Sequence, residues 1–455
     1  MCLIISRVRA TLILNALLVT ETTTEKVDVL IEDGVIAKMA HHDSPTYAAP
    51  SVPDDAVQEV IDAEGLLLFP GLIDCHVHFR EPGLMQKGDM ESESASAIAG
   101  GVTTVCDMPN TIPPTVTVSA LQDKARRAER RGHCDIRFFF GIADIAHCME
   151  LERLWFSVDP GWKRLKERVC GVKLYFDHST GNQGASAEVL RDAFRVCGAL
   201  KIPIVAHCED PMINAQAAER VPLKNVSDHS LRRPPASEEK AVERAIDLAK
   251  TYGTQLHIAH LSTKQGIALV RQAKAGGLRV TCEAAPHHLF LDTDDYRTLA
   301  TLAKMNPPLR TPDHTEALWR GIMDHTVDCI ATDHAPHTMQ EKKADDLSKV
   351  PSGVPGVETM LPLLMTVASS RDQMSQTNHQ ILYEDIVRLC FENPNRIFRL
   401  GKKGIVEGAR ADLTLVDPAA EWEIRGEDLR AKCGWTPYEG WKVKGRVVRY
   451  FCRRR

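Results

Sequence analysis

Two histidines separated by one residue, His76 and His78, are the first side chains whose types and spacing suggest chemistry. They end a short apolar run, residues 72–77, that has the composition of a β-strand. Residues i and i+2 of a strand point to the same side, so both imidazoles can bind one metal ion. A single pair of this kind also arises by chance. Asp74, two residues earlier, is a candidate acceptor that would orient one of the rings.

Three further residues of metal-binding type each come directly after another short apolar run: His207, His260 and Asp333. In a barrel of parallel strands the carboxyl ends lie at one face, where barrel enzymes place their catalytic groups. Each of these residues alone is more often an ordinary polar side chain. Five of them at corresponding positions favour a metal site, and mixed histidine and aspartate ligation suits zinc.

Lys173 lies within a further run of this kind, residues 172–176, and shares one face of the expected strand with Tyr175. An ordinary lysine would point to solvent. A lysine that faces a barrel interior needs a partner, because an isolated buried ammonium is costly. Carbon dioxide is one such partner, since a buried neutral amine can add it to form a carboxylate whose two oxygens bridge two metal ions. The site would then be binuclear.

These residues need a scaffold that brings strand ends together. Between about residues 75 and 368, β-branched runs alternate with amphipathic, Ala-rich segments, which is the pattern of βα units around a parallel sheet. We expect eight strands, at residues 72–77, 103–107, 136–141, 172–176, 202–206, 255–259, 279–283 and 328–332. We expect helices at residues 90–99, 187–200, 238–252, 265–275 and 359–368. This pattern predicts a TIM barrel, with a doubly wound open sheet as the alternative.

The two ends of the chain have a different pattern, with short strand-like runs between Gly and Asp turns. These runs are residues 27–31, 35–38, 57–62, 412–415 and 443–450. Each flank is too short to bury a core alone, so we expect both to form one small β-sandwich beside the barrel. The expected organisation is α/β, with residues 1–68 and 401–455 in the sandwich and 69–400 in the barrel. The turn-rich residues 342–356 follow the eighth strand and are a candidate active-site loop.

Composition and charge exclude several classes of partner. The 455 residues are 44% hydrophobic and 26% charged, with a formal net charge of −5, and the arginine clusters at 126–131 and 453–455 are short, so no nucleic-acid surface is expected. We find no secretion signal and no apolar run near the ~18 residues of a membrane span. Thirteen cysteines without a CxxC motif fit reduced thiols. We therefore expect a soluble, cytoplasmic protein that binds a small molecule.

Several longer motifs indicate a resemblance to a known protein family. The sequence FPGLID followed by HVHFREPG, and the segments DMPNT, KLYF, HSTGN, AHCED, HIAHLST, CEAAPHH, KMNPPLR and ATDHAPH, resemble the amidohydrolase superfamily and, within it, the dihydroorotases. The resemblance covers nearly the whole chain, including residues 408–412 and 435–441. Short motifs are individually weak, but this many in one order make a specific match.

The resemblance implies roles for particular residues. It implies six ligands for two zinc ions: His76, His78 and Asp333 for one ion, His207 and His260 for the other, and N6-carboxylated Lys173 as the bridge. Some dihydroorotases have an aspartate in place of this lysine, so the KLYF motif indicates the carboxylated subclass. Asp333 would also carry the proton from the attacking water to the leaving ring nitrogen. Glu283 could be a further outer ligand, although helix capping or a surface position is the more frequent role for such a residue.

The implied reaction is the reversible, zinc-dependent cyclisation of N-carbamoyl-L-aspartate to L-dihydroorotate in de novo pyrimidine biosynthesis. Arg80, two residues after His78, can form a two-pronged contact with the substrate carboxylate. The resemblance adds Asn110 and His337 as partners of that carboxylate and Asn306 as a ring contact. It also implies a homodimer, because members are commonly dimers.

Two other functions fit part of the pattern. Allantoinases and dihydropyrimidinases resemble the chain in their metal motifs, but their neutral substrates give Arg80 nothing to neutralise. A non-catalytic barrel that has lost its ligands is the alternative from another class. The six intact ligand positions argue against it.

Overall fold

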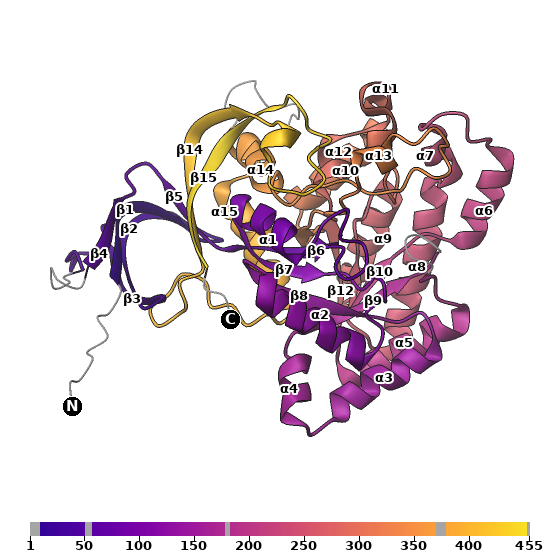
Figure 1. Ribbon diagram of the computed structural model, residues 1–455, viewed down its shortest axis with the longest axis horizontal. Coiled ribbons are helices and arrows are strands. Elements are labelled where there is room, and N and C mark those ends of the chain that lie inside the picture. The colour runs from indigo at the N-terminus through magenta and orange to yellow at the C-terminus, as the bar shows by residue number, and fades with distance from the viewer. Residues whose placement is uncertain (1–9, 51–56, 178–182, 370–378, 453–455) are drawn as a thin grey trace.

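The chain folds into an eight-stranded parallel barrel with a second sheet beside it (Figure 1). This computed structural model describes residues 10–50, 57–177, 183–369 and 379–452. The HSTGN motif at residues 178–182 and the arginine cluster at 453–455 lie outside the described residues. Within them, every helix is too short or too polar to cross a bilayer.

The barrel strands follow one another around the ring in chain order, each parallel to the next. They are β6 (Leu72–Val77), β7 (Val102–Asp107), β8 (Asp135–Gly141), β9 (Val169–Tyr175), β10 (Ile204–His207), β11 (Leu256–Ile258), β12 (Val280–Ala284) and β13 (Cys329–Ile330). Each predicted strand overlaps an observed one, which confirms the barrel and rejects the open sheet. The two ends of the ring meet where Val77 forms a parallel bridge with His334, just beyond β13.

Helices follow the barrel strands and pack around them (Figure 1). The longer ones are α1 (Met90–Ala99), α2 (Val118–Arg131), α3 (Ile145–Phe156), α5 (Ala187–Leu200), α6 (Pro211–Arg220), α8 (Pro235–Tyr252), α9 (Lys264–Ala275), α12 (Pro312–Met323) and α14 (Met360–Ser369). Short helices are α4 (Pro160–Lys166), α7 (Asp228–Arg232), α10 (Pro286–Phe290), α11 (Tyr296–Leu299), α13 (Met339–Lys342), α15 (Tyr383–Val387) and α16 (Asn393–Ile397). In α8, Ala241, Ala245 and Ala249 recur every four residues and are all buried, so the helix packs through one small-residue face. The five predicted helices are confirmed.

The sequence predicts a small β-sandwich made from both flanks. The structure does join both flanks beside the barrel, and their described strands form one seven-stranded sheet. Its strands are β1 (Ala10–Val19), β2 (Thr24–Glu32), β3 (Val35–His41), β4 (Val57–Asp62), β5 (Leu67–Pro70), β14 (Leu413–Glu423) and β15 (Lys442–Phe451). The antiparallel pair of β14 with β5 connects the two ends, with Leu415 opposite Leu68. Both leucines are fully buried in a cluster that is separate from the barrel core.

The sequence analysis did not predict β1 or β5. Asn15 interrupts the apolar run of β1, and it takes a left-handed conformation (φ 62°) at a register shift between Ile13 and Ala16. Its backbone N–H donates to Asp28 Oδ1 (2.8 Å) and its side chain donates to Asp62 Oδ1 (3.0 Å). Because both partners are distant in sequence, tertiary bonds make this interruption compatible with a strand.

Gly71 is the only residue between β5 of the terminal sheet and β6 of the barrel. Its N–H donates to the carbonyl of Asp412 (2.8 Å). A Cβ at this position would lie 2.1 Å from Thr103 Oγ1 and 2.4 Å from Asp412 Oδ1. The junction between the two units therefore has no room for a side chain.

We predict that Gly71→Ala lowers the free energy of unfolding by about 1–3 kcal/mol, the usual cost of overpacking. Urea unfolding followed by circular dichroism measures the change. Gly276→Ala is the matched control, because Gly276 has an ordinary φ of −77° and its added Cβ would meet nothing closer than 3.4 Å. Equal losses in the two variants would contradict the steric explanation.

Candidate active site

The histidines and acids identified in the sequence converge at the carboxyl ends of the barrel strands around one cavity. It is lined by His76, His78, Arg80, Asn110, Lys173, Tyr175, His207, His260, Asn306, Asp333, Ala335, Ser352 and Gly353. The six predicted metal ligands line it, as do the predicted substrate contacts Arg80, Asn110 and Asn306, whereas His337 does not. Ser352 and Gly353 belong to the turn-rich segment after the eighth strand, so this segment does reach the cavity, as expected.

His76 and His78 face Asp333 across the cavity. Their Nε2 atoms lie 3.3 and 2.9 Å from Asp333 Oδ1. On the outer side, His76 Nδ1 makes a short contact with Glu283 Oε1, and His78 Nδ1 lies 2.6 Å from Asn110 Oδ1. These outer oxygens accept hydrogen bonds, so each Nδ1 carries the proton and each Nε2 directs a lone pair at the Asp333 carboxylate.

His207 and His260 form a second pair. His207 Nε2 lies 2.8 Å from Glu209 Oε2 and is therefore the protonated nitrogen, which leaves a lone pair on Nδ1. That Nδ1 lies 3.0 Å from His260 Nε2. Burial lowers the pKa of both histidines, so both rings are neutral at physiological pH.

The donor atoms therefore fit a cation. Lone pairs of His76 and His78 aimed at a carboxylate oxygen repel it unless a positive charge lies between them. The ligand atoms of His76, His78 and Asp333 lie within 4.8 Å of one another, which suits ligation of one ion. Neutral imidazoles and a carboxylate are the donors that zinc prefers.

Lys173 lies on β9 with its side chain in the same cavity. The residue is 1% exposed, and Nζ has no hydrogen-bond partner among the described residues. It lies 4.9 Å from the ring centre of Tyr175, on the shared face that the strand period predicts. Burial lowers the pKa of Lys173 to about 8, which favours the neutral amine. An unpaired amine among metal-binding groups fits a lysine that acquires a carboxylate.

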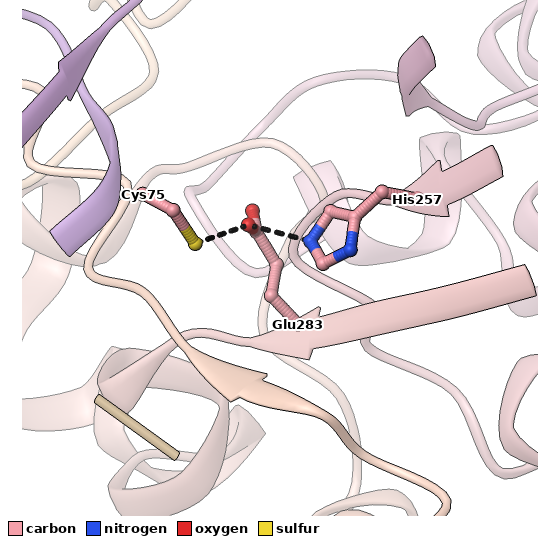
Figure 2. A group of neighbouring side chains, drawn as sticks. All are labelled: Cys75, His257 and Glu283. Carbon is pink, nitrogen blue, oxygen red and sulfur yellow. Dashed lines mark hydrogen bonds and ion pairs between the residues drawn. The ribbon is translucent and has the colours of Figure 1, made fainter. Parts of the chain in front are cut away.

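Glu283 does not cap a helix or lie at the surface, so the more frequent role weighed for it is wrong. It is fully buried on β12. Oε1 accepts from His76 Nδ1 and from the backbone of His260 (3.0 Å). Figure 2 shows the other side of the carboxylate, where Oε2 accepts from His257 Nε2 (3.1 Å) and Cys75 Sγ (3.6 Å). Cysteine, histidine and glutamate are metal-binding types, but these four hydrogen bonds account for both oxygens and make Glu283 a support for His76 and His260.

Asp74, unlike Glu283, does not contact an imidazole ring. Its Oδ1 accepts from the backbone N–H groups of His76 and Thr332, both at 3.1 Å, and Oδ2 accepts from the Thr332 hydroxyl at 2.5 Å. Asp74 lies on β6 and Thr332 follows β13, so this carboxylate ties together the two ends of the ring. The expected ring contact was wrong because the side chain reaches backbone donors first.

Glu209 was not identified from the sequence. It lies two residues after His207, in the AHCED motif, and an acid at that spacing was the available signal. Arg233 contacts both of its oxygens (2.9 and 2.7 Å) and also contacts Asp177 Oδ2 (2.9 Å). Arg233 therefore keeps Glu209 ionised, and Glu209 orients His207.

The same cavity carries polar groups expected to meet a substrate. Arg80 is 2% exposed and its Nε donates to the carbonyl of Pro336 (3.0 Å). Asn110 uses its carbonyl oxygen on His78 and leaves Nδ2 without a partner among the described residues. Asn306 accepts from His229 (2.8 Å). His337 lies behind Arg80 rather than at the cavity wall, 3.1 Å from its Nη2.

A parallel barrel with histidines, a lysine and an aspartate at the carboxyl strand ends defines the class of barrel hydrolases that act on amides. The family model described as "Amidohydrolase family" matches residues 67–453, and the chain belongs to this family. Several of its curated relatives within the family are named dihydroorotase. A protein named dihydroorotase from Halobacterium salinarum is 41% identical over 394 residues, which are 85% of this chain and 87% of that protein. A dihydroorotase from Bacillus cytotoxicus is 35% identical over 427 residues, covering 93% and 92% of the two chains.

Solved structures support the same fold. The L-hydantoinase (dihydropyrimidinase) from Arthrobacter aurescens superposes with a TM-score of 0.85 at 26% identity, covering 97% of this chain and 96% of that one. A dihydropyrimidinase from Brevibacillus agri gives a TM-score of 0.86 at 23% identity, covering 97% and 94%. The chain is thus a hydrolase of cyclic amides in architecture and in family.

We predict that Glu283→Gln weakens metal binding by about 10–100-fold, the usual cost of losing a group that orients a ligand. The amide would place N–H groups against donors that now meet a carboxylate. Titration with zinc of protein that has been stripped of metal by a chelator measures the zinc affinity. Glu358→Gln is the control, because Glu358 is a half-buried carboxylate that accepts from Ser96 and Arg430 and from none of the cavity-lining residues. Unchanged affinity in Glu283→Gln would contradict the supporting role.

Proposed function

We propose that this chain catalyses the reversible cyclisation of N-carbamoyl-L-aspartate to L-dihydroorotate in de novo pyrimidine biosynthesis, with two zinc ions per chain. The observation that carries the proposal is a single cavity whose lining combines metal-binding histidines and an aspartate with a buried arginine. The metal-binding residues suit attack on an amide carbonyl, and the arginine suits a carboxylate. Dihydroorotate has both groups.

His76, His78 and Asp333 would hold one ion, and His207 and His260 would hold the other. Two ions held this way would lower the pKa of a water molecule and polarise the amide carbonyl. Asp333 would accept the proton of that water during attack and return it to the ring nitrogen as the amide bond breaks. In the cyclising direction, Asp333 would take the proton from the carbamoyl nitrogen instead.

Lys173 would bridge the two ions as a carbamate. Its neutral amine would attack the carbon of carbon dioxide, forming an N–C bond and releasing one proton to solvent. The product is an anion with two oxygens, which a lysine ammonium cannot supply. The buried, unpartnered Nζ supports this assignment.

Arg80, with Asn110 Nδ2, would bind the substrate carboxylate, and Asn306 would contact the ring. A guanidinium binds a carboxylate through two parallel hydrogen bonds, and such charge-assisted bonds are about twice as strong as neutral ones. The hydantoinase and dihydropyrimidinase structures share the fold, so neutral cyclic amides are the competing substrates.

A cytoplasmic homodimer is part of the same proposal. The described cysteines are all free, which suits a reducing compartment. Subunit mass from sedimentation in solution tests the dimer.

We predict that the enzyme turns over dihydroorotate in preference to allantoin and dihydrouracil, and that Arg80→Met removes this preference. Loss of a charge-assisted contact worth about 1.5–3 kcal/mol lowers kcat/KM roughly 10–150-fold on dihydroorotate and carbamoyl aspartate alike. Arg80→Lys should recover only part of the loss, because it lacks the two-pronged geometry. Zinc content should stay unchanged. Faster turnover of allantoin or dihydrouracil by the unmodified enzyme would replace the proposed function with the corresponding alternative.

We predict that the purified enzyme holds two zinc ions per chain and that Lys173→Ala loses most of its zinc and its activity. Short carboxylic acids such as acetate should restore part of the activity by supplying bridging oxygens. Elemental analysis and turnover with added acid measure the two effects. Lys201→Ala is the control, since Lys201 is an exposed lysine at the end of α5. Full activity in Lys173→Ala would exclude the carbamate.

A further inference from the structure

His337 lies between two cations, Arg80 and Lys87, beside the cavity. Its Nδ1 is 3.1 Å from Lys87 Nζ. Its Nε2 is 3.1 Å from Arg80 Nη2 and 3.1 Å from the carbonyl oxygen of Ser352. Arg80 and Lys87 can only donate hydrogen bonds, so the position of the His337 proton decides which of them is satisfied.

Lys87 decides where that proton lies. Burial, together with Arg80 and Lys87, lowers the pKa of His337 to about 3, so the ring is neutral and carries one N–H. Burial lowers the pKa of Lys87, and its pairing with Glu341 Oε1 at 3.0 Å opposes that shift and favours the charged form. Neither cation has a lone pair to offer, but the acceptor within hydrogen-bond distance of the ring, the Ser352 carbonyl oxygen, lies beside Nε2, whereas Glu341 Oε2 is 3.8 Å from Nδ1. Nδ1 therefore accepts from the Lys87 ammonium, and the proton lies on Nε2. The Nε2–H then donates to the Ser352 carbonyl.

In this tautomer, His337 offers no acceptor to Arg80 Nη2. Arg80 Nη2 faces an N–H instead of a lone pair, and two donors cannot bond to each other. In the other tautomer, Nε2 would accept from Nη2, and the guanidinium would be held by His337. We propose that Lys87, kept charged by Glu341, fixes His337 in the Nε2–H form and so leaves an Arg80 N–H free for the substrate carboxylate. Lys87 acts through His337, which makes it a positioning residue, and the proposal rests on the proposed function.

The experiment on the resting enzyme uses full-length protein labelled with ¹⁵N-histidine and assigned with His337→Gln. We expect the Nδ1 of His337 to resonate as an unprotonated nitrogen and Nε2 as a protonated one. Lys87→Met should move the proton toward Nδ1, and Lys87→Arg should restore the original form. Lys343→Met, at an exposed lysine in the same segment, should leave the spectrum unchanged. A protonated Nδ1 in the unmodified enzyme would overturn the proposal without bearing on the reaction.

Kinetics test the consequence for substrate recognition. In Lys87→Met we expect KM for carbamoyl aspartate to rise on the order of tenfold, the cost of weakening one charge-assisted bond, with a smaller change in kcat. In an Arg80→Met background the same substitution should cost nothing further, because the bond it protects is already absent. If Lys87→Met fails to fold, Glu341→Gln, which removes the partner that keeps Lys87 charged, should show the same spectral shift and the same non-additivity. Additive losses in the double variant, or an unchanged tautomer with a raised KM, would overturn the proposal.

Discussion

A buried acceptor on the outer nitrogen of three imidazoles is the constraint on which the site depends. Glu283 holds His76, Asn110 holds His78 and Glu209 holds His207. Each acceptor fixes the proton on the outer nitrogen and turns the other lone pair toward the cavity. β12 carries Glu283 and β6 carries His76, and these strands lie near opposite ends of the strand order. Only closure of the barrel brings this pair together, so the chemistry of the site requires the ring.

Other hydrogen bonds of the site hold residues whose backbone is strained. Arg80, His260 and Asp333 have φ values of 67°, 32° and 46°, in the left-handed region that non-glycine residues rarely adopt. Such residues cost on the order of 1–3 kcal/mol each and persist only where their surroundings hold them. Glu283 Oε1 accepts from the His260 N–H, and Pro336 accepts from Arg80 Nε. One carboxylate thus orients a side chain of the first predicted metal group and the backbone of the second.

The sequence predicts the barrel, its strands and the histidines and aspartate of the cavity because each leaves a local signal, whereas Asn110 and Asn306 were implied by the family resemblance. Alternation of apolar runs predicts the strands, and HxH or a histidine after a run predicts the cavity wall. The supporting roles of Glu283 and Lys87 leave no such signal, because their histidine partners lie 207 and 250 residues away in the sequence. Glu209 is different, because its spacing of two residues from His207 was a local signal that the sequence analysis did not use. For Asp74 a local pattern gave the wrong prediction. Its spacing from His76 suggested a contact with an imidazole ring, but closure of the barrel brings the backbone N–H of Thr332 to its carboxylate, and no local pattern predicts that contact. β1 was missed for a related reason, because its bulge at Asn15 is compensated by Asp28 and Asp62.

Under the proposed function, burial of Arg80 would let the site distinguish charged from neutral cyclic amides. The ring amide, which these substrates share, would meet the same metal-binding residues in every case. Arg80 is almost fully buried, and burial lowers its pKa, as expected for a cation with too few partners. A neutral substrate would displace water from the cavity and leave this cation without an anion, which is costly in a low-dielectric site. A carboxylate removes that cost, so discrimination arises as much from the penalty on the wrong substrate as from attraction of the right one.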